Sequence, residues 1–431
     1  MGLVSQHIVG SESFFSNTKG IGGKLRKRFD DFEVEEVVSI PGRSHWIWMQ
    51  NSANGKHQIV KIKANNWDTH VLIKELSRKL SIGQRSIGFA GTKDKRAVTT
   101  QHFSIRTSVD KLSNVDLKNI ELEYLHSSIK PIRLGNLVGN KFKIKVTNSD
   151  NSEDNINKIL SELRGFFPNY FGVQRFGAVR PITHIVGEKI VRGDYEGAVL
   201  DYLTFESTKF AGHEGREYLS KTRDFTKSLE KFPSNMLFER QLLGHLSRNP
   251  EDYPGAILQL PESLSKMLVH GYQSLIFNKV LDMRIREGTD ACFPQIGDCV
   301  MPADGYGGPD QRVTIEVTER NQSKLSKRCR EGKAWVAGLL PGANSKFSKG
   351  RQGELEKKVM DDLGVKFKDF IIDEIPDLSS YGMYRPLFQK YNDINVEFDS
   401  GNPIFSFWLH KGTYATSFLR EIMKSSDVTV Y

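Results

Sequence analysis

One carboxylate, Asp94, stands among three cations in the segment 88–101 of this 431-residue chain. Its neighbours are Lys93, Lys95 and Arg96. Three nearby cations should lower the pKa of Asp94 below the value of about 3.9 for an isolated aspartate, which keeps it ionised at neutral pH. An ionised carboxylate could act as a nucleophile or as a general base. The same spacing also fits a solvated turn in which the aspartate only pairs with lysine.

Two strand-like runs flank this segment. Ile87 and Phe89 alternate with small or polar residues before it, and residues 98–105 predict a second extended run after it. A loop between two strands presents its side chains at the edge of a sheet, and we expect Asp94 in such a loop.

Further elements must position that loop. Alternating apolar residues from 32 to 63, including Trp46 and Trp48, predict strands. A helix is expected over 68–80, with Asp68 as its N-cap and leucines repeating every four residues. Strands first and helices between them predict an α+β fold class built on a largely antiparallel sheet.

The pattern becomes helical beyond residue 181. Apolar residues in 263–284 follow one helical stripe, which is more typical of a core than of a binding face. Short strands such as 313–317 follow, and 399–402 lies between two apolar runs as the turn of a hairpin. A basic stretch between them contains Lys324, Lys327, Arg328, Arg330 and Lys333. These cations could form a solvated surface or contact RNA, and the sequence leaves both interpretations open.

Bulk composition describes an ordinary globular chain with a basic balance. Hydrophobic residues make up 38% and charged residues 26%, and the length allows two or three domains. Lys plus Arg is 61 against 52 for Asp plus Glu, a formal net charge of +9. This charge favours a polyanionic partner, which could be RNA, DNA or an acidic membrane.

Cysteine usage and the absence of apolar runs limit the cellular setting. Cys292, Cys299 and Cys329 show no Cys-x-x-Cys spacing and no adjacent histidine pair, so we expect no metal site. The N-terminus lacks the order of a signal peptide, and no apolar run reaches about 18 residues. We expect a reducing, cytoplasmic location and no membrane partner.

Five segments resemble, in the same order, the sequence elements of the TruD family of tRNA pseudouridine synthases. The segment 88–101 resembles A-G-x-K-D-x-x-A-V-T-x-Q, and 169–177 matches N-Y-F-G-x-Q-R-F-G at every fixed position. Segments 29–36, 139–142 and 412–421 resemble P-E-D-F-x-V-x-E, G-N-x-F and G-x-F-A-T-x-x-x-R-E. These matches span nearly the whole chain.

The resemblance implies a pseudouridine-synthase-like catalytic domain with a largely antiparallel mixed sheet, plus an inserted α+β domain. Because the family elements bracket the helical middle, we expect residues 1–184 and 378–431 to form the catalytic domain and 185–377 the insert. The implied partner is tRNA, and the implied reaction converts a uridine, at position 13, into pseudouridine. No protein partner is implied.

The implied reaction is an isomerisation. It breaks the N-glycosidic bond of a uridine in RNA, turns the uracil, and rejoins it through C5 to the same ribose carbon. Such a reaction calls for no metal and no redox cofactor. By resemblance Asp94 is the catalytic residue, and its carboxylate could act covalently or by removing a ribose proton.

Phe171 and Asn169 are the first candidates for substrate binding. The target base must leave its stack at a cost of a few kcal/mol, which a stack on an aromatic ring, worth about 1–3 kcal/mol, would offset. The family places an aromatic substrate contact at the position of Phe171, although the residue alone fits a core phenylalanine equally well. Asn169 could bond the uracil edge or fix the loop around Asp94, and we favour the second role.

Arg26 is the third candidate for substrate binding. The family carries a lysine five residues before the aspartate of its N-terminal element, and Arg26 stands at that position. Arginine keeps the cation and could hold a carboxylate or phosphate by two parallel hydrogen bonds. Phe29 departs from the family proline, and Tyr414 departs from a phenylalanine. Arg26 could equally belong to a solvated strand start that contacts RNA phosphate.

Five more polar residues are expected to support the site or contact RNA rather than break bonds. They are Lys93, Gln174, Arg175, Arg385 and Arg420. The two last arginines could each pair with a carboxylate instead.

Two rival functions remain to be compared with an isomerase. A catalytically silent RNA-binding or RNA-folding protein would explain the net charge, basic strands and aromatic residues equally well, and an Asp94 variant separates the two. A nucleotide-phosphate enzyme would use residues 91–94 as a phosphate loop. The G-x-x-x-x-G-K-[ST] spacing that cradles phosphate is absent, so we set this function aside.

Overall fold

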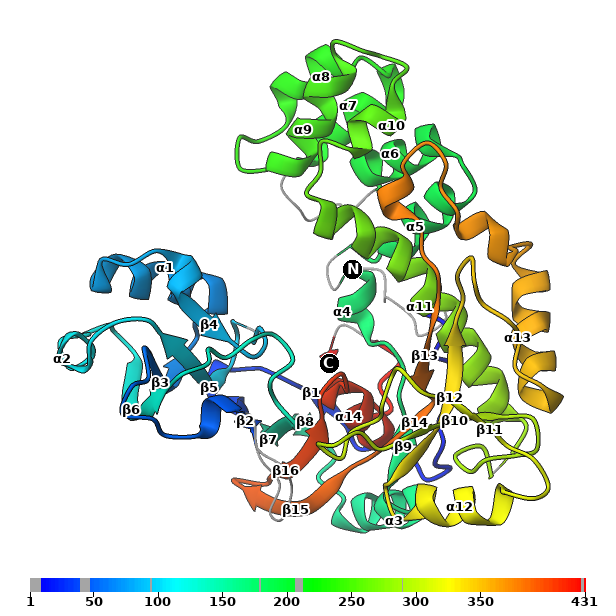
Figure 1. Ribbon diagram of the computed structural model, residues 1–431. Helices are drawn as coiled ribbons and strands as arrows, with labels where there is room; N and C mark the ends of the chain where they lie inside the picture. The colour runs from blue at the N-terminus through cyan, green and yellow to red at the C-terminus, as the bar shows by residue number, and fades with distance from the viewer. Residues whose placement is uncertain are drawn as a thin grey trace.

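The computed structural model describes residues 9–38, 47–93, 95–177, 180–205, 212–288, 290–427 and 430–431. Asp94 and Trp46 lie outside the described residues. One large sheet, several smaller sheets and an outer group of helices make up the described chain (Figure 1).

The large sheet is mixed and mostly antiparallel. Its strand order is β15-β16-β7-β2-β5-β3-β6, with β4 paired to β5. The strands are β2 (Phe32–Val37), β3 (His57–Asn65), β4 (Ile87–Phe89), β5 (Val98–Ile105), β6 (Ile120–Ser128), β7 (Gly139–Lys145), β15 (Asn392–Asp399) and β16 (Asn402–His410). Only the β2–β5 pair among these strands is parallel. The predicted α+β fold with a largely antiparallel mixed sheet is confirmed, and strands from both ends of the chain are neighbours in it.

Helices cover one face of this sheet. They are α1 (Thr69–Leu80), α2 (Val109–Leu112), α3 (Glu153–Leu163) and α14 (Ala415–Met423). The N-cap Asp68 accepts hydrogen bonds from the backbone N–H groups of His70 and Val71, as expected for a helix that begins there. Leucines of α1 pack in one core cluster with β3 and β5, and α3 and α14 pack in another with β7 and β16. Two separate cores therefore support the two halves of the sheet.

Smaller sheets contain the other strands of the described chain. Two pairs, β1 (Gly22–Lys24) with β8 (Thr147–Ser149) and β9 (Phe166–Pro168) with β14 (Phe388–Lys390), are antiparallel. A four-stranded antiparallel sheet has the order β11-β10-β12-β13. Its strands are β10 (Cys299–Pro302), β11 (Ile315–Glu316), β12 (Ala334–Leu340) and β13 (Met383–Pro386). The edge strand β13 follows residue 378, so the two predicted domains share this sheet.

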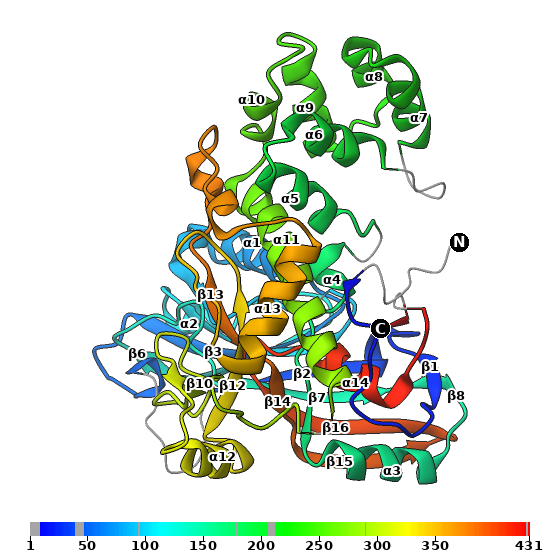
Figure 2. The ribbon, with the colours of Figure 1, turned by 90° about the vertical axis from the view of Figure 1, so that its right-hand side faces the viewer.

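Of the remaining helices, those within residues 183–257 form the upper part of the molecule in Figures 1 and 2, and the others lie below them. They are α4 (Val173–Phe176), α5 (Thr183–Val191), α6 (Tyr195–Thr204), α7 (His213–Thr222), α8 (Phe225–Lys231), α9 (Leu237–Leu246), α10 (Tyr253–Ile257), α11 (Glu262–Arg286), α12 (Gln322–Arg330) and α13 (Gly350–Asp362). The helix expected over 263–284 is α11, and it packs along α5 in the largest core cluster. The short 3-10 helices among the described residues are η2 (Phe29–Asp31), η3 (Ile47–Met49), η4 (Gln84–Ser86), η5 (Phe367–Phe370) and η6 (Pro376–Leu378).

Two local predictions need correction. Trp48 was expected in a strand, but it lies in the 3-10 helix η3. Its ring is 3% exposed and packs with Ile59 and Ala90 in a small core cluster, so its apolar character reflects burial rather than strand pairing. The strand expected over 313–317 is paired only at Ile315–Glu316.

Candidate active site

The chain on both sides of position 94 is described, and Asp94 itself lies outside the described residues. This segment joins β4 to β5 of the large sheet. Lys93, the last residue before the gap, donates its backbone N–H to Thr69 Oγ1 at 2.9 Å. The first residue of α1 therefore holds the backbone that leads into position 94.

Lys93 also forms a nearly buried ion pair with Glu36. Its Nζ lies 2.7 Å from Glu36 Oε1, and the two side chains are 8% and 0% exposed. Glu36 Oε2 accepts the backbone N–H of His102 at 2.8 Å. Burial raises the pKa of Glu36, but the hydrogen bonds from His102 and the charge of Lys93 outweigh it and leave that pKa lowered. Glu36 is therefore ionised and balances the charge of Lys93.

A second buried contact fixes the same stretch of backbone. Gln101 Nε2 donates to Gly91 O at 2.8 Å, and Thr69 Oγ1 donates to Gln101 Oε1 at 3.2 Å. Thr69 and Gln101 are each 2% exposed. Residues 91–93 are thus tied to α1, to β5 and, through Glu36, to β2.

Arg26 lies beside the chain that follows position 94. Its carbonyl accepts a hydrogen bond from Arg96 Nη2 at 3.0 Å. Its guanidinium Cζ lies 4.1 Å from the ring centroid of Phe32, a cation–π contact. Arg26 has a φ of 55°, in the left-handed region that residues other than glycine rarely adopt. The structure brings Arg26 to the Asp94 loop through its backbone.

Asn169 is fully buried between β9 and α4. Its Nδ2 donates to Pro386 O at 2.8 Å, and its Oδ1 accepts from Arg385 Nη2 at 2.8 Å. Its backbone N–H donates to Leu387 O at 2.8 Å. Because both polar atoms of the side chain are bonded within the protein, the contacts favour a bracing role over a hydrogen bond to uracil.

Phe171 lies in an enclosed cluster of rings and guanidinium groups. It is 6% exposed, and Arg385 Cζ is 4.1 Å from its ring centroid. Phe277 meets it edge-on at 5.6 Å between centroids, and the ring of Tyr414 is 6.2 Å away. A base that stacked on the ring face covered by Arg385 would have to displace the guanidinium. Stacking of the substrate on Phe171 stays a prediction.

Arg385 joins two of the segments that carry the family resemblance. Its Nη2 bonds Asn169 Oδ1, and its Nη1 donates to Gly412 O at 3.1 Å. Burial, with a smaller contribution from the nearby Arg175, lowers the pKa of Arg385 to about 10. In the part of the chain that the structure describes, no carboxylate pairs with Arg385.

Gln174 and Arg175 stand in α4, directly after Gly172. Arg175 Nε donates to Ser274 Oγ on α11 at 3.1 Å, and its Cζ lies 5.6 Å from the ring centroid of Phe171. Burial lowers the pKa of Arg175 as well. Gln174 is half-buried beside Gly172. Arg175 and Arg385 together make the surroundings of Phe171 electropositive.

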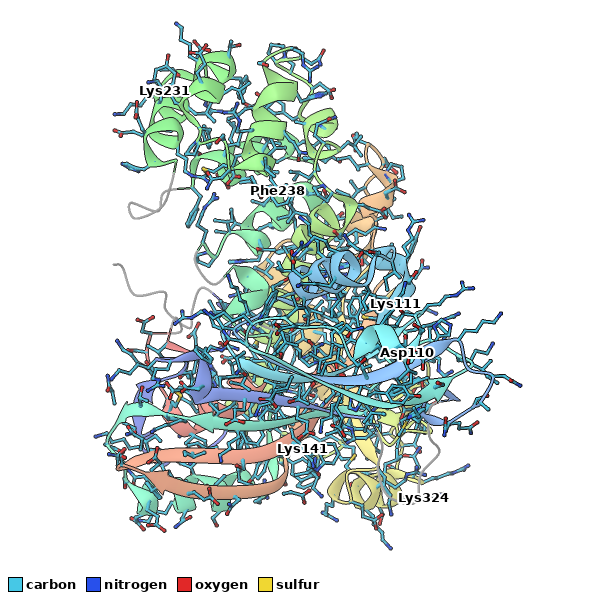
Figure 3. All side chains as sticks on the ribbon, turned by 90° about the vertical axis from the view of Figure 1, so that its left-hand side faces the viewer. Asp110, Lys111, Lys141, Lys231, Phe238 and Lys324 are labelled. Carbon is cyan, nitrogen blue, oxygen red and sulfur yellow. The ribbon has the colours of Figure 1, made fainter. Side chains whose placement is uncertain are left out.

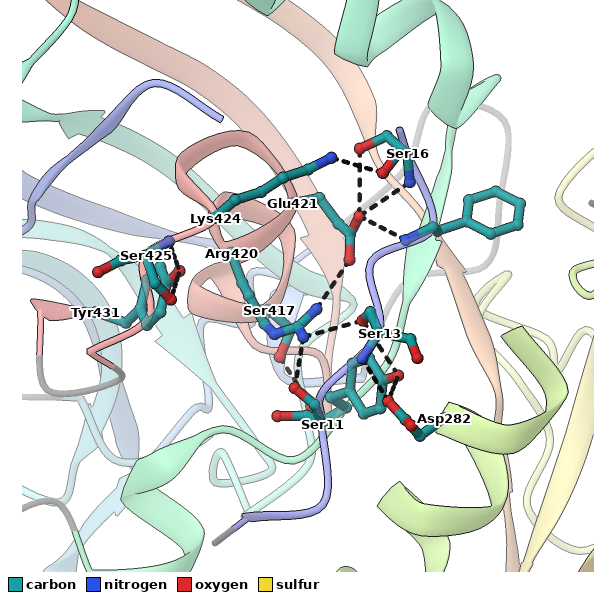
Figure 4. A network of polar contacts seen from close by, with 12 residues as sticks. Ser11, Ser13, Ser16, Asp282, Ser417, Arg420, Glu421, Lys424, Ser425 and Tyr431 are labelled. Atoms are coloured by element: carbon teal, nitrogen blue, oxygen red, sulfur yellow. Dashed lines mark hydrogen bonds and ion pairs between the residues drawn. The ribbon is translucent and has the colours of Figure 1, made fainter. Parts of the chain in front are cut away.

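Arg420 lies in a different network, on α14 (Figure 4). It is 5% exposed, and its Nη2 donates to the carbonyls of Ser11 and Ser13. Its Nη1 lies 3.0 Å from Glu421 Oε1, and Glu421 Oε2 accepts the backbone N–H of Phe15. These contacts attach the N-terminal segment to α14, which favours support of the fold over contact with RNA.

The sequence did not indicate several residues that hold the site together. Glu36 and Gln101 lie inside segments with the family resemblance, at the last position of each, but received no role. Asn278 on α11 was expected only as part of a core helix. Its Oδ1 accepts the backbone N–H of Phe171 at 2.9 Å, and its Nδ2 donates to Phe171 O at 3.0 Å. A polar residue within an apolar helical stripe was the available signal.

Metal ligands and membrane spans were searched within the described ranges. No group of three or more His, Cys, Asp or Glu side chains there is placed to hold a metal ion. Cys292, Cys299 and Cys329 are all free thiols. No helix of the described chain combines the length and the apolar character needed to cross a bilayer.

Comparison with known proteins gives one consistent family. The model of the family "tRNA pseudouridine synthase D (TruD)" matches residues 8–422. A protein of Methanosarcina mazei named "Probable tRNA pseudouridine synthase D" is 38% identical over 434 residues, 96% of each chain. A protein of the same name from Thermococcus sibiricus is 36% identical over 421 residues, 95% of this chain and 97% of the relative.

A solved structure agrees with the sequence relatives. The crystal structure of a TruD protein from Methanosarcina mazei superposes with a TM-score of 0.85, at 36% identity, and covers 100% of both chains. With the family model matching nearly the full length, the chain belongs to the TruD family of tRNA pseudouridine synthases.

Proposed function

We propose that the protein isomerises a uridine of tRNA to pseudouridine and that Asp94 is the catalytic residue. The observation that carries the proposal is the buried Glu36–Lys93 pair, which fixes the residue next to Asp94 inside the resembling segment 88–101. Burying an ion pair costs desolvation free energy, and this pair holds a loop rather than the centre of a core. The family match over residues 8–422 supports tRNA as the substrate.

The reaction balances without a co-reactant. The bond between N1 of uracil and the ribose carbon breaks, a bond between C5 and the same carbon forms, and one proton moves from C5 to N1. In a covalent route the Asp94 carboxylate bonds to the ribose carbon and is displaced when C5 attacks. In a second route the carboxylate removes a ribose proton and returns it. Both routes end with an isomer of the substrate, so we propose a cofactor-independent enzyme.

The target uridine must turn out of its stack to reach a protein carboxylate. We propose uridine 13 of tRNA as the target, by family resemblance. Phe171 and Tyr414 supply apolar ring surface, and Arg175 and Arg385 supply positive charge around it. Arg26 contacts the chain that follows position 94 through its backbone carbonyl, and its guanidinium, over the ring of Phe32, is a further cation. These residues would bind the extruded nucleotide, and Asn169 would hold their geometry.

The domain division belongs to the same proposal. Residues 1–184 and 378–431 form the catalytic domain, and 185–377 form an insert that closes the opposite wall over the RNA. Asn278 on α11 supports a role for the insert, because it bonds both backbone groups of Phe171. The substitution Asn278→Ala should therefore reduce conversion of bound tRNA.

The experiment is incubation of the purified protein with an unmodified tRNA transcript in buffer that contains a chelator and no added cofactor. Pseudouridine is then mapped by its reaction with carbodiimide and reverse transcription. The proposal predicts one modified uridine, at position 13. Tight binding of the transcript with no pseudouridine would instead identify a catalytically silent RNA-binding protein.

A further inference from the structure

The helix α12 presents a row of cations to solvent. Its sequence from Gln322 to Arg330 contains four cations and no carboxylate. Leu325 and Cys329 are its buried residues. The four cations are exposed, and we call them the α12 basic face: Lys324, Lys327, Arg328 and Arg330.

On several other helices at least one cation is paired with a carboxylate about one turn away. Such pairs join Arg78 to Glu75 on α1, Lys158 to Asp154 on α3, Lys221 to Glu217 on α7, Lys266 to Glu262 on α11 and Lys357 to Asp361 on α13. Within the described residues, no ion pair reaches any member of the α12 basic face. The next carboxylate along the chain, Glu331, is bonded to Lys333 Nζ at 2.7 Å.

Cations spaced three or four residues apart on one helix repel each other and weaken it. Lys324 has this spacing to both Lys327 and Arg328. The helix dipole favours cations in the last turn, which offsets the repulsion only in part. A polyanion lying along the helix would remove the repulsion, so the unpaired row fits a phosphodiester backbone.

Cations from neighbouring elements extend the α12 basic face. Arg330 and Arg164, the latter at the end of α3, lie with their Cζ atoms 5.1 Å and 5.7 Å from the ring centroid of Phe293. The side chain of Lys390, in β14, lies against Gly332, where an added Cβ would be 3.1 Å from Lys390 Cδ. Three elements far apart in sequence thus gather positive charge at one end of the molecule, where Figure 3 shows Lys324.

The four-stranded sheet links the α12 basic face to the candidate active site. After α12 the chain enters β12, in which Gly338 pairs with Arg385 of β13. Gly338 follows Lys333 by five positions, which is about 17 Å of extended chain at about 3.3 Å per residue. That length corresponds to about five steps of a nucleic-acid duplex at about 3.4 Å each. The end of α12 and the strand position that pairs with Arg385 are therefore separated by a distance that a short RNA duplex can span.

We propose that the α12 basic face binds the phosphate backbone of the tRNA substrate outside the catalytic cleft. This inference rests on the proposed function for the identity of the RNA. The contact is made to phosphates and carries no base readout, so it strengthens binding of tRNA without entering the chemical step. The sequence alone did not decide whether these cations form a solvated surface or contact RNA.

The test measures the equilibrium affinity for unmodified tRNA transcript at several salt concentrations. The variant Lys324→Gln/Lys327→Gln/Arg328→Gln is compared with Arg351→Gln/Lys357→Gln/Lys358→Gln on α13. The control variant also replaces two lysines and one arginine. In the wild type, each of these three cations is paired with a carboxylate. Both variants therefore lower the net charge by three units.

The proposal predicts that the α12 variant binds tRNA about ten-fold more weakly at low salt than the α13 control. The slope of log Kd against log salt should fall by about two, because each lost phosphate contact removes about 0.7–0.9 from it. The rate at saturating tRNA should stay the same. Equal affinity and equal slope for the two variants would overturn the proposal. Binding is measured without turnover, so an inactive enzyme would leave this result intact.

Discussion

Lys93 Nζ lies 2.7 Å from Glu36 Oε1, inside the protein and one residue before Asp94. The backbone N–H of the same lysine is bonded to Thr69. Lys93 is therefore fixed at both ends, by β2 through its side chain and by α1 through its backbone. The catalytic loop proposed here is held by its neighbours rather than by a core of its own.

The substitution Glu36→Gln tests this arrangement. Glutamine keeps the shape of the glutamate side chain but leaves the ammonium group of Lys93 buried without a counter-charge. The free energy of unfolding should therefore fall by about 3–5 kcal/mol. We also expect kcat on tRNA to fall by about ten-fold or more, because a loop held less rigidly loses orientation of its carboxylate. KM should change little. Urea unfolding and steady-state kinetics measure the two effects.

The double variant Glu36→Gln/Lys93→Met is the control. It removes both charges, so most of the lost stability should return while kcat stays low. Recovery of kcat together with stability would mean that the pair only stabilises the fold.

Arg385→Lys tests the bridge between two of the family segments. Arg385 bonds Asn169 Oδ1 and Gly412 O while its guanidinium lies over Phe171. A lysine ammonium cannot make this planar contact with two arms, so the single-turnover rate should fall by about ten-fold or more. Arg175→Lys, which loses one hydrogen bond to Ser274, is the matched control and should fall less. Wild-type rates for Arg385→Lys would contradict the bridge.

Phe171→Leu separates a substrate contact from a core role. Phe171 and Phe277 are both buried and pack against each other, so leucine at either position should cost a similar stability, less than about 3 kcal/mol. If Phe171 contacts the target base, only its variant should also lose about ten-fold or more in kcat/KM, since base stacking is worth about 1–3 kcal/mol. Thermal unfolding and kinetics on the two variants check this. Equal kinetics for both would leave Phe171 as a core residue.

The pH dependence of stability should carry a contribution from His184 on α5. Burial lowers its pKa from 6.5 to about 4, with a smaller effect from Lys279, and its ring lies edge-on to Phe176 at 5.1 Å. Between these two pKa values the unfolded chain binds a proton that the folded protein does not, so stability falls as the pH drops from 6.5 to 4. The full loss is about 3 kcal/mol, at about 1.4 kcal/mol per pKa unit.

The variant His184→Leu checks this contribution. This variant lacks the titrating group. Between pH 7 and pH 4 its free energy of unfolding should therefore decrease by about 3 kcal/mol less than the free energy of unfolding of the wild type does. Urea unfolding at several pH values measures both proteins. Parallel curves for the two would contradict the assignment to His184.

Local elements were predictable from the sequence, and the contacts between them were not. The helix at 68–80 carries its own cap and its own leucine repeat, so local physics sets its start and its buried face. Trp48 was misplaced because an aromatic residue in an alternating run looks the same whether it pairs in a strand or fills a small core. A local pattern does not tell whether an aromatic residue lies in a paired strand or fills a small core.

The candidate site shows the same limit. Resemblance selected Asp94, Asn169, Phe171 and Arg26, but the partner of Lys93 could not be read from the sequence. Glu36 precedes Lys93 by 57 positions, and only the pairing of β2 beside β5 brings them together. The guanidinium that lies over the ring of Phe171 comes from Arg385 in β13, more than 200 residues later in the chain. Long-range pairing of this kind follows from topology rather than from local sequence.

The most direct measurement of the central claim compares the wild type with Asp94→Asn on the same unmodified tRNA. The account predicts that the asparagine variant binds tRNA with an affinity within about two-fold of the wild type, because the substitution removes one acid and no cation. It predicts that the same variant forms no detectable pseudouridine. Formation of pseudouridine by Asp94→Asn at the wild-type rate would contradict the account.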